Sequence, residues 1–139
     1  MLIPGIIKGG SNSDHRGTIS FVNDFKMDDV KRFYIIKHPD TSIVRAWRGH
    51  KIEQRWFYVV KGSFKIKSVK IDNWESPSKN LEQITFILSA DDSCVLHMPK
   101  GYATSLQALE DEATLIVFAD YGIENAENDN YLYPVDYFG

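Results

Sequence analysis

The segment RWFYVVKGSFKIKSVKI, residues 55–71, decides the fold class, because two apolar runs meet within it at Lys61-Gly62. Both runs are rich in Val, Ile, Phe and Tyr, which are the residue types that favour β-strands. A glycine-containing pair between two such runs is typical of a hairpin turn. We therefore expect two consecutive strands joined by a tight hairpin.

The second of these strands changes face part-way along its length. Phe64 and Ile66 lie on one face in strict alternation, whereas Val69 and Ile71 lie on the other face. The slip predicts a β-bulge or a strong twist near Ser68, of the kind that bends strands around a barrel.

Runs of the same kind recur along the chain, bounded by Gly, Pro, Asn or Asp, with no long helical pattern between them. Closely spaced short strands are typical of all-β sandwiches and barrels. The expected strands are Thr18–Val22, Arg32–Ile36, Ser42–Trp47, Trp56–Val60, Ser63–Ile71, Gln83–Leu88, Ser93–Met98, Thr104–Leu109 and Thr114–Ala119.

Length and composition narrow the class of protein further. A chain of 139 residues with 43% hydrophobic and 25% charged residues fits one globular domain, residues 1–139. The net charge of -3 argues against a nucleic-acid partner.

The N-terminal apolar run is broken by Pro4 and Gly5, so neither a signal peptide nor a membrane span is expected. The single Cys94, set in an apolar strand, suits a buried thiol in a cytoplasmic protein.

The last segment, residues 122–139, combines acidic residues with aromatic ones. Aromatic side chains in a polar tail pack on an apolar surface. We expect this tail to cap an open end of the barrel or to pack on a partner subunit. The aromatic residues concerned are Tyr131, Tyr133, Tyr137 and Phe138.

The segment RAWRGHKIEQRW, residues 45–56, concentrates positive charge in a run that otherwise resembles a strand. Arg48 and His50 are two residues apart, so they share a face if the strand is regular. Two interpretations stay open. The charges either protect a solvated edge strand from aggregation or line a pocket for an anion.

Several short motifs occur in the order found in one known family. The chain resembles the dTDP-4-dehydrorhamnose 3,5-epimerases and the sugar 3,4-ketoisomerases of the cupin superfamily. This resemblance implies a jelly-roll (double-stranded β-helix) barrel with few or no helices, a homodimer, and a nucleotide-linked keto sugar as ligand. The matching pieces are Asp14-His15-Arg16-Gly17, Val44-Arg45, Gln54-Arg55, Lys61-Gly62, Asp72, Ser76-Pro77-Ser78, Pro99-Lys100-Gly101-Tyr102-Ala103 and Asp120-Tyr121.

The metal site of other cupins does not fit this sequence. Arg48 and His50 hold the two histidine positions of the first cupin motif, Arg55 holds the carboxylate position, and Thr104 holds the later histidine position. Guanidinium groups cannot ligate a divalent cation. We therefore expect neither a metal nor another cofactor, in keeping with the metal-free chemistry of the family that the chain resembles.

The resemblance assigns roles to particular residues. Epimerising a carbon beside a ketone requires a base, a group that holds the enolate oxygen and an acid. Arg45, Arg48 and Arg55 suit the enolate oxygen or a diphosphate, because guanidiniums stay charged and bind phosphate in two-pronged fashion. His50 matches the second active-site histidine of the ketoisomerases and is the expected base.

The sequence departs from the epimerases at their catalytic positions. Arg48 and Thr104 occupy the places of the two family histidines, and Gly122 lies at or near the place of the acidic tyrosine. Tyr121 or Tyr102 could donate a proton instead, and we name Tyr121 as the expected second catalytic residue. Tyr102 and Thr104 complete the expected substrate-binding set.

The other polar candidates are assigned minor roles. His97 is expected to be a hydrogen-bonded core residue, and His15 and His38 to lie on the surface. Asp120 either orients His50 or Arg48, or begins a turn.

Two functions remain open. The first is an epimerase or isomerase of a nucleotide-activated keto-deoxy sugar in surface-polysaccharide synthesis. The alternative is a non-catalytic sugar-nucleotide or carbohydrate-binding cupin that has lost its base.

Overall fold

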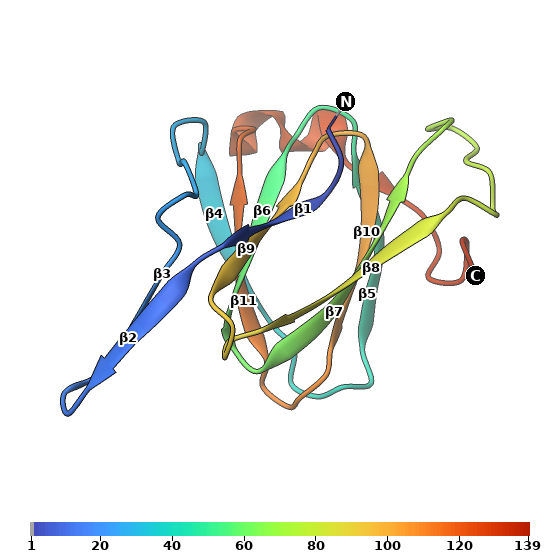
Figure 1. Cartoon of the computed structure of the whole chain (residues 1–139). Coiled ribbons are helices and arrows are strands. Elements are labelled where there is room, and N and C mark those ends of the chain that lie inside the picture. Colours follow the sequence, from blue (N-terminus) through green and yellow to red (C-terminus); the bar gives the residue numbers. More distant parts are fainter. Residues whose placement is uncertain (1) are drawn as a thin grey trace.

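The computed structural model describes residues 2–139, which form an antiparallel β-barrel of two facing five-stranded sheets (Figure 1). The first sheet has the order β1 (Gly5–Lys8), β9 (Cys94–Met98), β6 (Arg55–Lys61), β11 (Thr114–Ala119) and β4 (Arg32–Lys37). The second has the order β12 (Tyr131–Leu132), β5 (Val44–His50), β10 (Tyr102–Ala108), β7 (Ser63–Lys70) and β8 (Gln83–Ser89). This is the jelly roll that the family resemblance implies.

Each of the nine expected strands is present, with ends that differ by up to three residues. Sequence reasoning missed β1, β2, β12 and a short 3-10 helix, η1 (Ile123–Asp129). The segment β2 (Gly10–Asp14) has the sequence GSNSD and carries no apolar alternation to signal a strand. Within the described residues, no helix is long and apolar enough to cross a membrane.

The core lies between the two sheets and follows the alternation of the strands. On β11, Leu115 and Val117 are fully buried while their neighbours are partly exposed. Phe57 and Leu96 join them from other strands of the same sheet, and Phe64 meets them from the facing sheet. Burying each such side chain contributes about 1.5–3 kcal/mol to the stability of the barrel.

The expected hairpin at Lys61-Gly62 is wrong. Strand β6 belongs to the first sheet and β7 to the second, so the turn carries the chain across the barrel. Gly62 has a positive φ of 73°, and a Cβ built on it would lie 3.1 Å from the Cβ of Ala113. Alternation within each strand is the same for a paired hairpin and for a corner between sheets, so the sequence could not separate them.

The expected bulge near Ser68 is also wrong. Strand β7 pairs without a register shift to β8 and to β10 through this position. Val69 is buried on the opposite face of the same regular strand, because the C-terminal segment covers that face. Phe138 packs edge-on against Trp47 there, with ring centroids 5.0 Å apart. A strand covered on both faces breaks the apolar alternation without any distortion.

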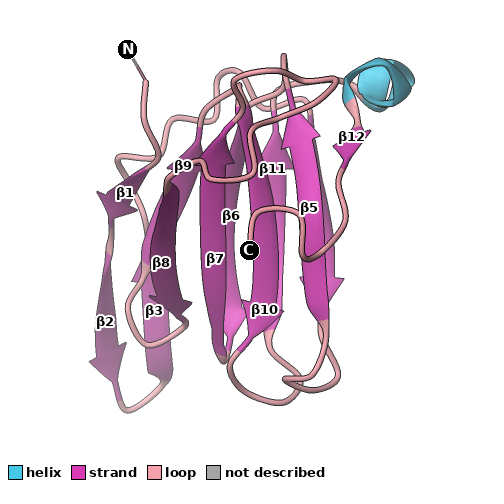
Figure 2. Ribbon diagram, turned by 90° about the vertical axis from the view of Figure 1, so that its right-hand side faces the viewer, coloured by secondary structure: helices cyan, strands magenta, loops and turns pink. Residues whose placement is uncertain are grey.

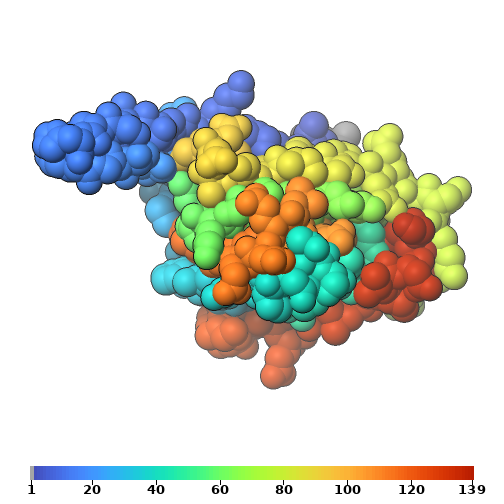
Figure 3. Space-filling view, turned by 90° about the horizontal axis from the view of Figure 1, so that it is seen from below, coloured from blue at the N-terminus to red at the C-terminus, as the bar shows by residue number. Residues whose placement is uncertain are grey.

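Two segments extend from the barrel. The hairpin of β2 and β3 (Gly17–Phe21) projects away from its body as an arm (Figures 1 and 3). The C-terminal segment places η1 at one end of the barrel and then runs along the edge strand β5 (Figure 2). Tyr133 donates a hydrogen bond to the carbonyl of Trp74 at 2.7 Å, and Tyr137 donates one to Pro77 at 2.6 Å.

Candidate functional site

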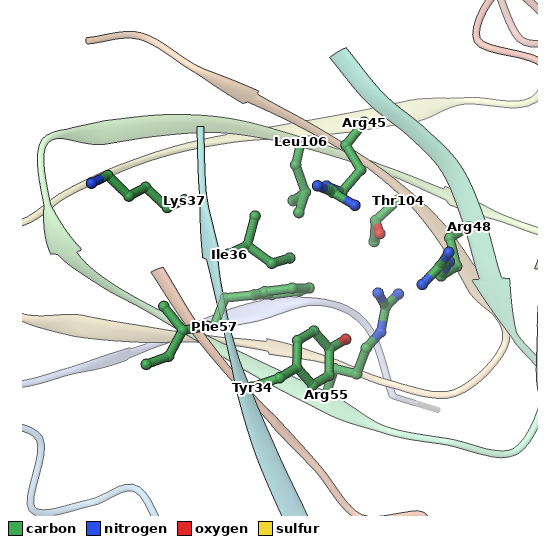
Figure 4. Close-up of a pocket in the computed structure, with 10 residues that line it drawn as sticks. Tyr34, Ile36, Lys37, Arg45, Arg48, Arg55, Phe57, Thr104 and Leu106 are labelled. Atoms are coloured by element: carbon green, nitrogen blue, oxygen red, sulfur yellow. The ribbon is translucent and has the colours of Figure 1, made fainter. Parts of the chain in front are cut away.

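Strands β4, β5, β6 and β10 enclose a cavity of about 380 Å³ inside the barrel (Figure 4). Its lining combines basic side chains with Tyr34, Phe57 and aliphatic groups, and it includes no carboxylate. A volume of this size suits a small-molecule ligand. We call it the arginine cavity, and its basic and hydroxyl-bearing lining residues are Tyr34, Lys37, Arg45, Arg48, Arg55 and Thr104.

A register shift brings two of the arginines to the same cavity. Residues three apart in a regular strand point to opposite faces. In the ladder between β5 and β10, Arg48 lies opposite Thr104 and Arg45 lies opposite Leu106. Three residues of β5 therefore match two of β10, and both guanidiniums reach the interior.

Arg55 is the most enclosed cation of the cavity, at 4% exposed. Its guanidinium carbon lies 5.3 Å from the centroid of the Phe57 ring. Burial lowers the pKa of Arg55, and the nearby Tyr34 and Glu53 partly offset that effect. Among the described residues, no carboxylate forms an ion pair with Arg45, Arg48 or Arg55. Of these three, Arg55 is buried, whereas Arg45 and Arg48 are exposed. Because an unpaired buried charge is unfavourable, Arg55 in particular is suited to receive an anion.

A second cavity of about 310 Å³ adjoins the first beneath η1. Tyr34 and Arg48 line both cavities, so they mark the boundary between them. His50 lines the second cavity on the same side of β5 as Arg48, as the sequence spacing predicts. We call it the histidine cavity, and its remaining lining residues are Arg32, Ile123, Ala126, Glu127 and Asn130.

The imidazole of His50 has one defined tautomer. Its Nδ1 lies 2.7 Å from the carbonyl oxygen of Asp129, and a carbonyl only accepts, so Nδ1 carries the proton. The lone pair is then on Nε2, which is enclosed and lies 3.6 Å from Oε2 of Glu53. Burial, with a further effect of Arg55, lowers the pKa of His50 to about 3, so the ring is neutral near pH 7. A role as base requires the ring to turn toward the cavity when substrate binds.

Asp129 fixes the loop that follows His50. Its buried carboxylate accepts hydrogen bonds from the backbone N–H groups of Lys51, Ile52 and Glu53, at 2.7 to 3.1 Å. The same residue contacts His50 through its carbonyl. One residue of the C-terminal segment thus holds both the imidazole and the turn beside it.

Glu53 is a buried acid among cations. Its Oε1 accepts a hydrogen bond from Arg32 at 3.3 Å, while its Oε2 has no hydrogen-bond partner among the described residues. Burial raises the pKa of Glu53, and Arg55 and Arg32 act against that rise. The Glu53 carboxyl therefore pairs with Arg32 behind the imidazole. The guanidiniums of the arginine cavity are left without a carboxylate partner.

The structure brings together Arg45, Arg48, Arg55 and Thr104 in one cavity, with His50 beside them. The two expected tyrosines lie elsewhere. Tyr102 is 4% exposed and lines a separate apolar groove with Ile71 and Leu81. Tyr121 is half-buried and is not among the described residues that line either cavity. Its backbone carbonyl accepts a hydrogen bond from the side chain of Arg32.

Three minor expectations are tested by the contacts. His97 is a hydrogen-bonded residue as expected, because Nε2 lies 2.8 Å from Oε1 of Gln54 and the ring stacks on Trp56. The surface position expected for His38 is wrong, because that ring is 1% exposed and packs edge-on against Phe64. His38 directly follows β4, and its turn-like sequence context gave no sign that the ring would be buried.

Asp120 does not orient His50. Its carboxylate accepts hydrogen bonds from the backbone and side-chain amides of Gln54, at 2.7 and 3.1 Å. The residue that does contact the imidazole, Asp129, lies 79 positions away in the chain and carries no local signal of that contact.

Sequence reasoning also missed Tyr34 and Arg32. Both lie on the inward face of β4, where exposed Phe33 and Ile35 alternate with them. The available signal was the pair of polar residues two positions apart, Arg32 and Tyr34, at the start of a largely apolar strand. Among the described residues, no group of three or more His, Cys, Asp or Glu side chains is arranged to hold a metal ion.

Comparison of this sequence with known families decides its membership. Residues 5–138 match the model of the family described as FdtA: WxcM-like, C-terminal. The chain belongs to this WxcM-like family. No curated protein matches the sequence.

Solved structures share the fold of this WxcM-like protein. A histidine-to-asparagine mutant of the 3,4-ketoisomerase QdtA from Thermoanaerobacterium thermosaccharolyticum, in complex with TDP-4-keto-6-deoxyglucose, is 23% identical with a TM-score of 0.74, over 99% of this chain and 94% of that one. A 3,4-ketoisomerase from Helicobacter canadensis is 17% identical with a TM-score of 0.74, over 99% and 96%. The dTDP-4-dehydrorhamnose 3,5-epimerase from Sulfolobus tokodaii is 21% identical with a TM-score of 0.78, over 98% and 80%.

Proposed function

We propose that this protein is a metal-free isomerase or epimerase of a nucleotide-activated keto-deoxy sugar. The observation that carries the proposal is the arginine cavity, where three guanidiniums without carboxylate partners lie next to His50 inside the barrel. Membership of the WxcM-like family supports it, as do structural relatives named as ketoisomerases and epimerases.

The chemistry divides between the two cavities. Arg45, Arg48 and Arg55 bind the diphosphate or hold the oxygen on which charge develops, because their guanidiniums stay charged and donate paired hydrogen bonds. His50 takes the proton from the carbon next to the ketone through Nε2, the ring nitrogen with the lone pair. Thr104, 2% exposed between the arginines, offers a hydroxyl to the sugar.

A non-catalytic binding protein is the second candidate. Arg48 stands where the related epimerases have a catalytic histidine, and Nε2 of His50 is enclosed in the unliganded chain. Such a protein would bind the nucleotide sugar in the arginine cavity and leave its carbon-bound protons in place.

The setting follows from the same proposal. The protein acts in the cytoplasm, in the synthesis of surface polysaccharide, on a soluble nucleotide sugar. It works as a homodimer that pairs through its β-sheets. Exposed apolar side chains on the outer face of β4, Phe33 at 63% and Ile35 at 60%, are candidates for that contact.

Proton exchange separates the two functions. The purified protein is mixed with dTDP-4-keto-6-deoxyglucose in deuterated water, and NMR follows ligand binding and the carbon-bound proton next to the ketone. We expect loss of that proton signal with wild-type protein, and binding without loss with His50→Asn. Saturable binding without exchange by the wild type supports the binding protein. Wild-type exchange rates in the variant would remove His50 from the role of base.

A further inference from the structure

The short helix η1 forms one wall of the histidine cavity. Its residues Ile123, Ala126 and Glu127, with Asn130 directly after it, line that cavity, and Figure 2 shows the helix at one end of the barrel, beside β12. Side chains three positions apart in a 3-10 helix point the same way, so Ile123 and Ala126 form one apolar strip. This wall takes no part in removing the proton or in binding the diphosphate.

The wall is anchored beside His50. The Asp129 carboxylate, at the C-terminal end of η1, accepts hydrogen bonds from the backbone N–H groups of residues 51–53, at 2.7 to 3.1 Å. Soon after η1, Tyr131 pairs with Gly49 in the ladder between β12 and β5. Side chains on an element anchored in this way can recognise a ligand without first becoming ordered.

Glu127 makes the histidine cavity electrostatically different from the arginine cavity. Of the described residues that line the two cavities, Glu127 is the one acid, and it forms no ion pair with another described residue. A carboxylate repels a diphosphate but accepts hydrogen bonds from sugar hydroxyls. A nucleotide sugar therefore binds with its diphosphate among the unpaired guanidiniums and its sugar against η1.

The apolar strip of η1 suits a different part of the sugar. Ile123 is 69% exposed, so an apolar group of a ligand that covers it removes apolar surface from water. A keto sugar that is deoxygenated at carbon 6 carries a methyl group there. A hydroxymethyl group in the same place would lose hydration of its oxygen against the strip without gaining a partner.

We propose that η1 is the element that selects the sugar. Glu127 accepts a hydrogen bond from a sugar hydroxyl, and Ile123 packs on the methyl group at carbon 6. The inference rests on the proposed function, because His50 and the arginines place the sugar in this cavity. It adds to that function the residues that distinguish one sugar from another.

Calorimetric titration with three ligands that lack a ketone tests the proposal, because none of them can be enolised and turned over. Binding of dTDP reports the nucleoside and diphosphate alone. The second ligand, dTDP-quinovose, adds 6-deoxyglucose, and the third, dTDP-glucose, has a hydroxymethyl group in place of the methyl group.

The proteins compared are wild type, Glu127→Ala, Ile123→Ala and, as the matched control, Glu124→Ala. Glu124 is an exposed acid on the same helix and is not among the described residues that line either cavity. The altered side chains are exposed, so the fold should persist, and the affinity for dTDP checks this in each variant.

We expect wild type and Glu124→Ala to bind dTDP-quinovose about tenfold more tightly than dTDP-glucose. Glu127→Ala should bind dTDP-quinovose about tenfold more weakly than wild type does, because a charged acceptor is lost, with dTDP affinity within about twofold of wild type. Ile123→Ala should reduce the preference for dTDP-quinovose over dTDP-glucose to about twofold or less.

Wild-type affinity for dTDP-quinovose in Glu127→Ala overturns the role of Glu127, and an unchanged preference in Ile123→Ala overturns that of Ile123. Equal losses of dTDP and dTDP-quinovose affinity in Glu127→Ala also overturn the proposal, since η1 would then act on the nucleotide. Catalysis is tested separately by proton exchange from dTDP-4-keto-6-deoxyglucose, and its absence in a wild type that discriminates the sugars overturns catalysis alone. A wild type that binds none of the three ligands overturns both.

Discussion

The two adjoining cavities treat charge in opposite ways. Beside His50, the two buried carboxylates have internal partners: Glu53 accepts a hydrogen bond from Arg32, and Asp129 accepts hydrogen bonds from three backbone N–H groups. In the arginine cavity, Arg45 and Arg55 have no carboxylate partner among the described residues. Charged groups that have partners inside the protein stabilise its structure, whereas charged groups without partners are available to bind a ligand. The comparison therefore separates residues that hold the site from residues that use it.

The largest expected effect is a loss of stability when Asp129, a residue that holds the site in place, is changed. Asp129→Ala removes the acceptor of three backbone N–H groups, and each buried donor left unpaired costs about 1–3 kcal/mol. We expect the free energy of unfolding to fall by about 3 kcal/mol or more, measured by urea denaturation. Asp136→Ala, at an exposed position in the same segment, is the control and should change little. A loss below about 1 kcal/mol for Asp129→Ala would show that the loop does not depend on this carboxylate.

A smaller effect appears in the pH dependence of stability. The pKa of His50 is lowered from 6.5 to about 3 by burial, so the unfolded chain takes up a proton that the folded chain refuses. Stability is therefore full above pH 6.5 and is lost as the pH falls from 6.5 toward 3. Between pH 7 and pH 5 this one group removes about 2 kcal/mol.

His50→Asn tests that slope, with His15→Asn, on the exposed arm, as the control. Urea denaturation at pH 7 and pH 5 should show a smaller acid loss in His50→Asn than in wild type. Glu53, whose pKa is raised by burial, acts in the opposite direction, and His38 adds to the acid loss. The difference between variant and wild type isolates His50, and equal slopes in the two proteins would contradict the buried neutral imidazole.

The sequence predicts the scaffold better than the site, for a physical reason. Strand alternation records which side of a strand is buried, so the strands and an all-β sandwich or barrel follow from it, while the jelly roll is what the family resemblance implies. Alternation does not record which sheet a strand joins, so it predicts a hairpin at Lys61-Gly62, where the chain in fact passes from one sheet to the other. Nor does it show burial on a second face, which is why Val69 suggested a bulge.

The sequence also predicts only part of the candidate site. The clustered charges of residues 45–56 left a solvated edge strand and a pocket both open, and the three arginines of the segment line one cavity with Thr104. The contacts that set the state of His50 come from Asp129 and Glu53, and the tyrosine that lines both cavities is Tyr34. Such partners meet only after folding, and no spacing rule along the chain connects them.

The measurement that tests the central claim most directly is a calorimetric titration of dTDP into wild type, Arg55→Met and Lys61→Met. Met keeps the apolar volume of Arg55 and removes a buried unpaired charge, so the fold should persist. Lys61 is exposed at the end of β6 and serves as the matched loss of one positive charge. If the unpaired guanidiniums receive the diphosphate, Arg55→Met lowers the affinity by about 100-fold and Lys61→Met leaves it close to wild type. Equal affinity in all three proteins would contradict the arginine cavity as the nucleotide-sugar site.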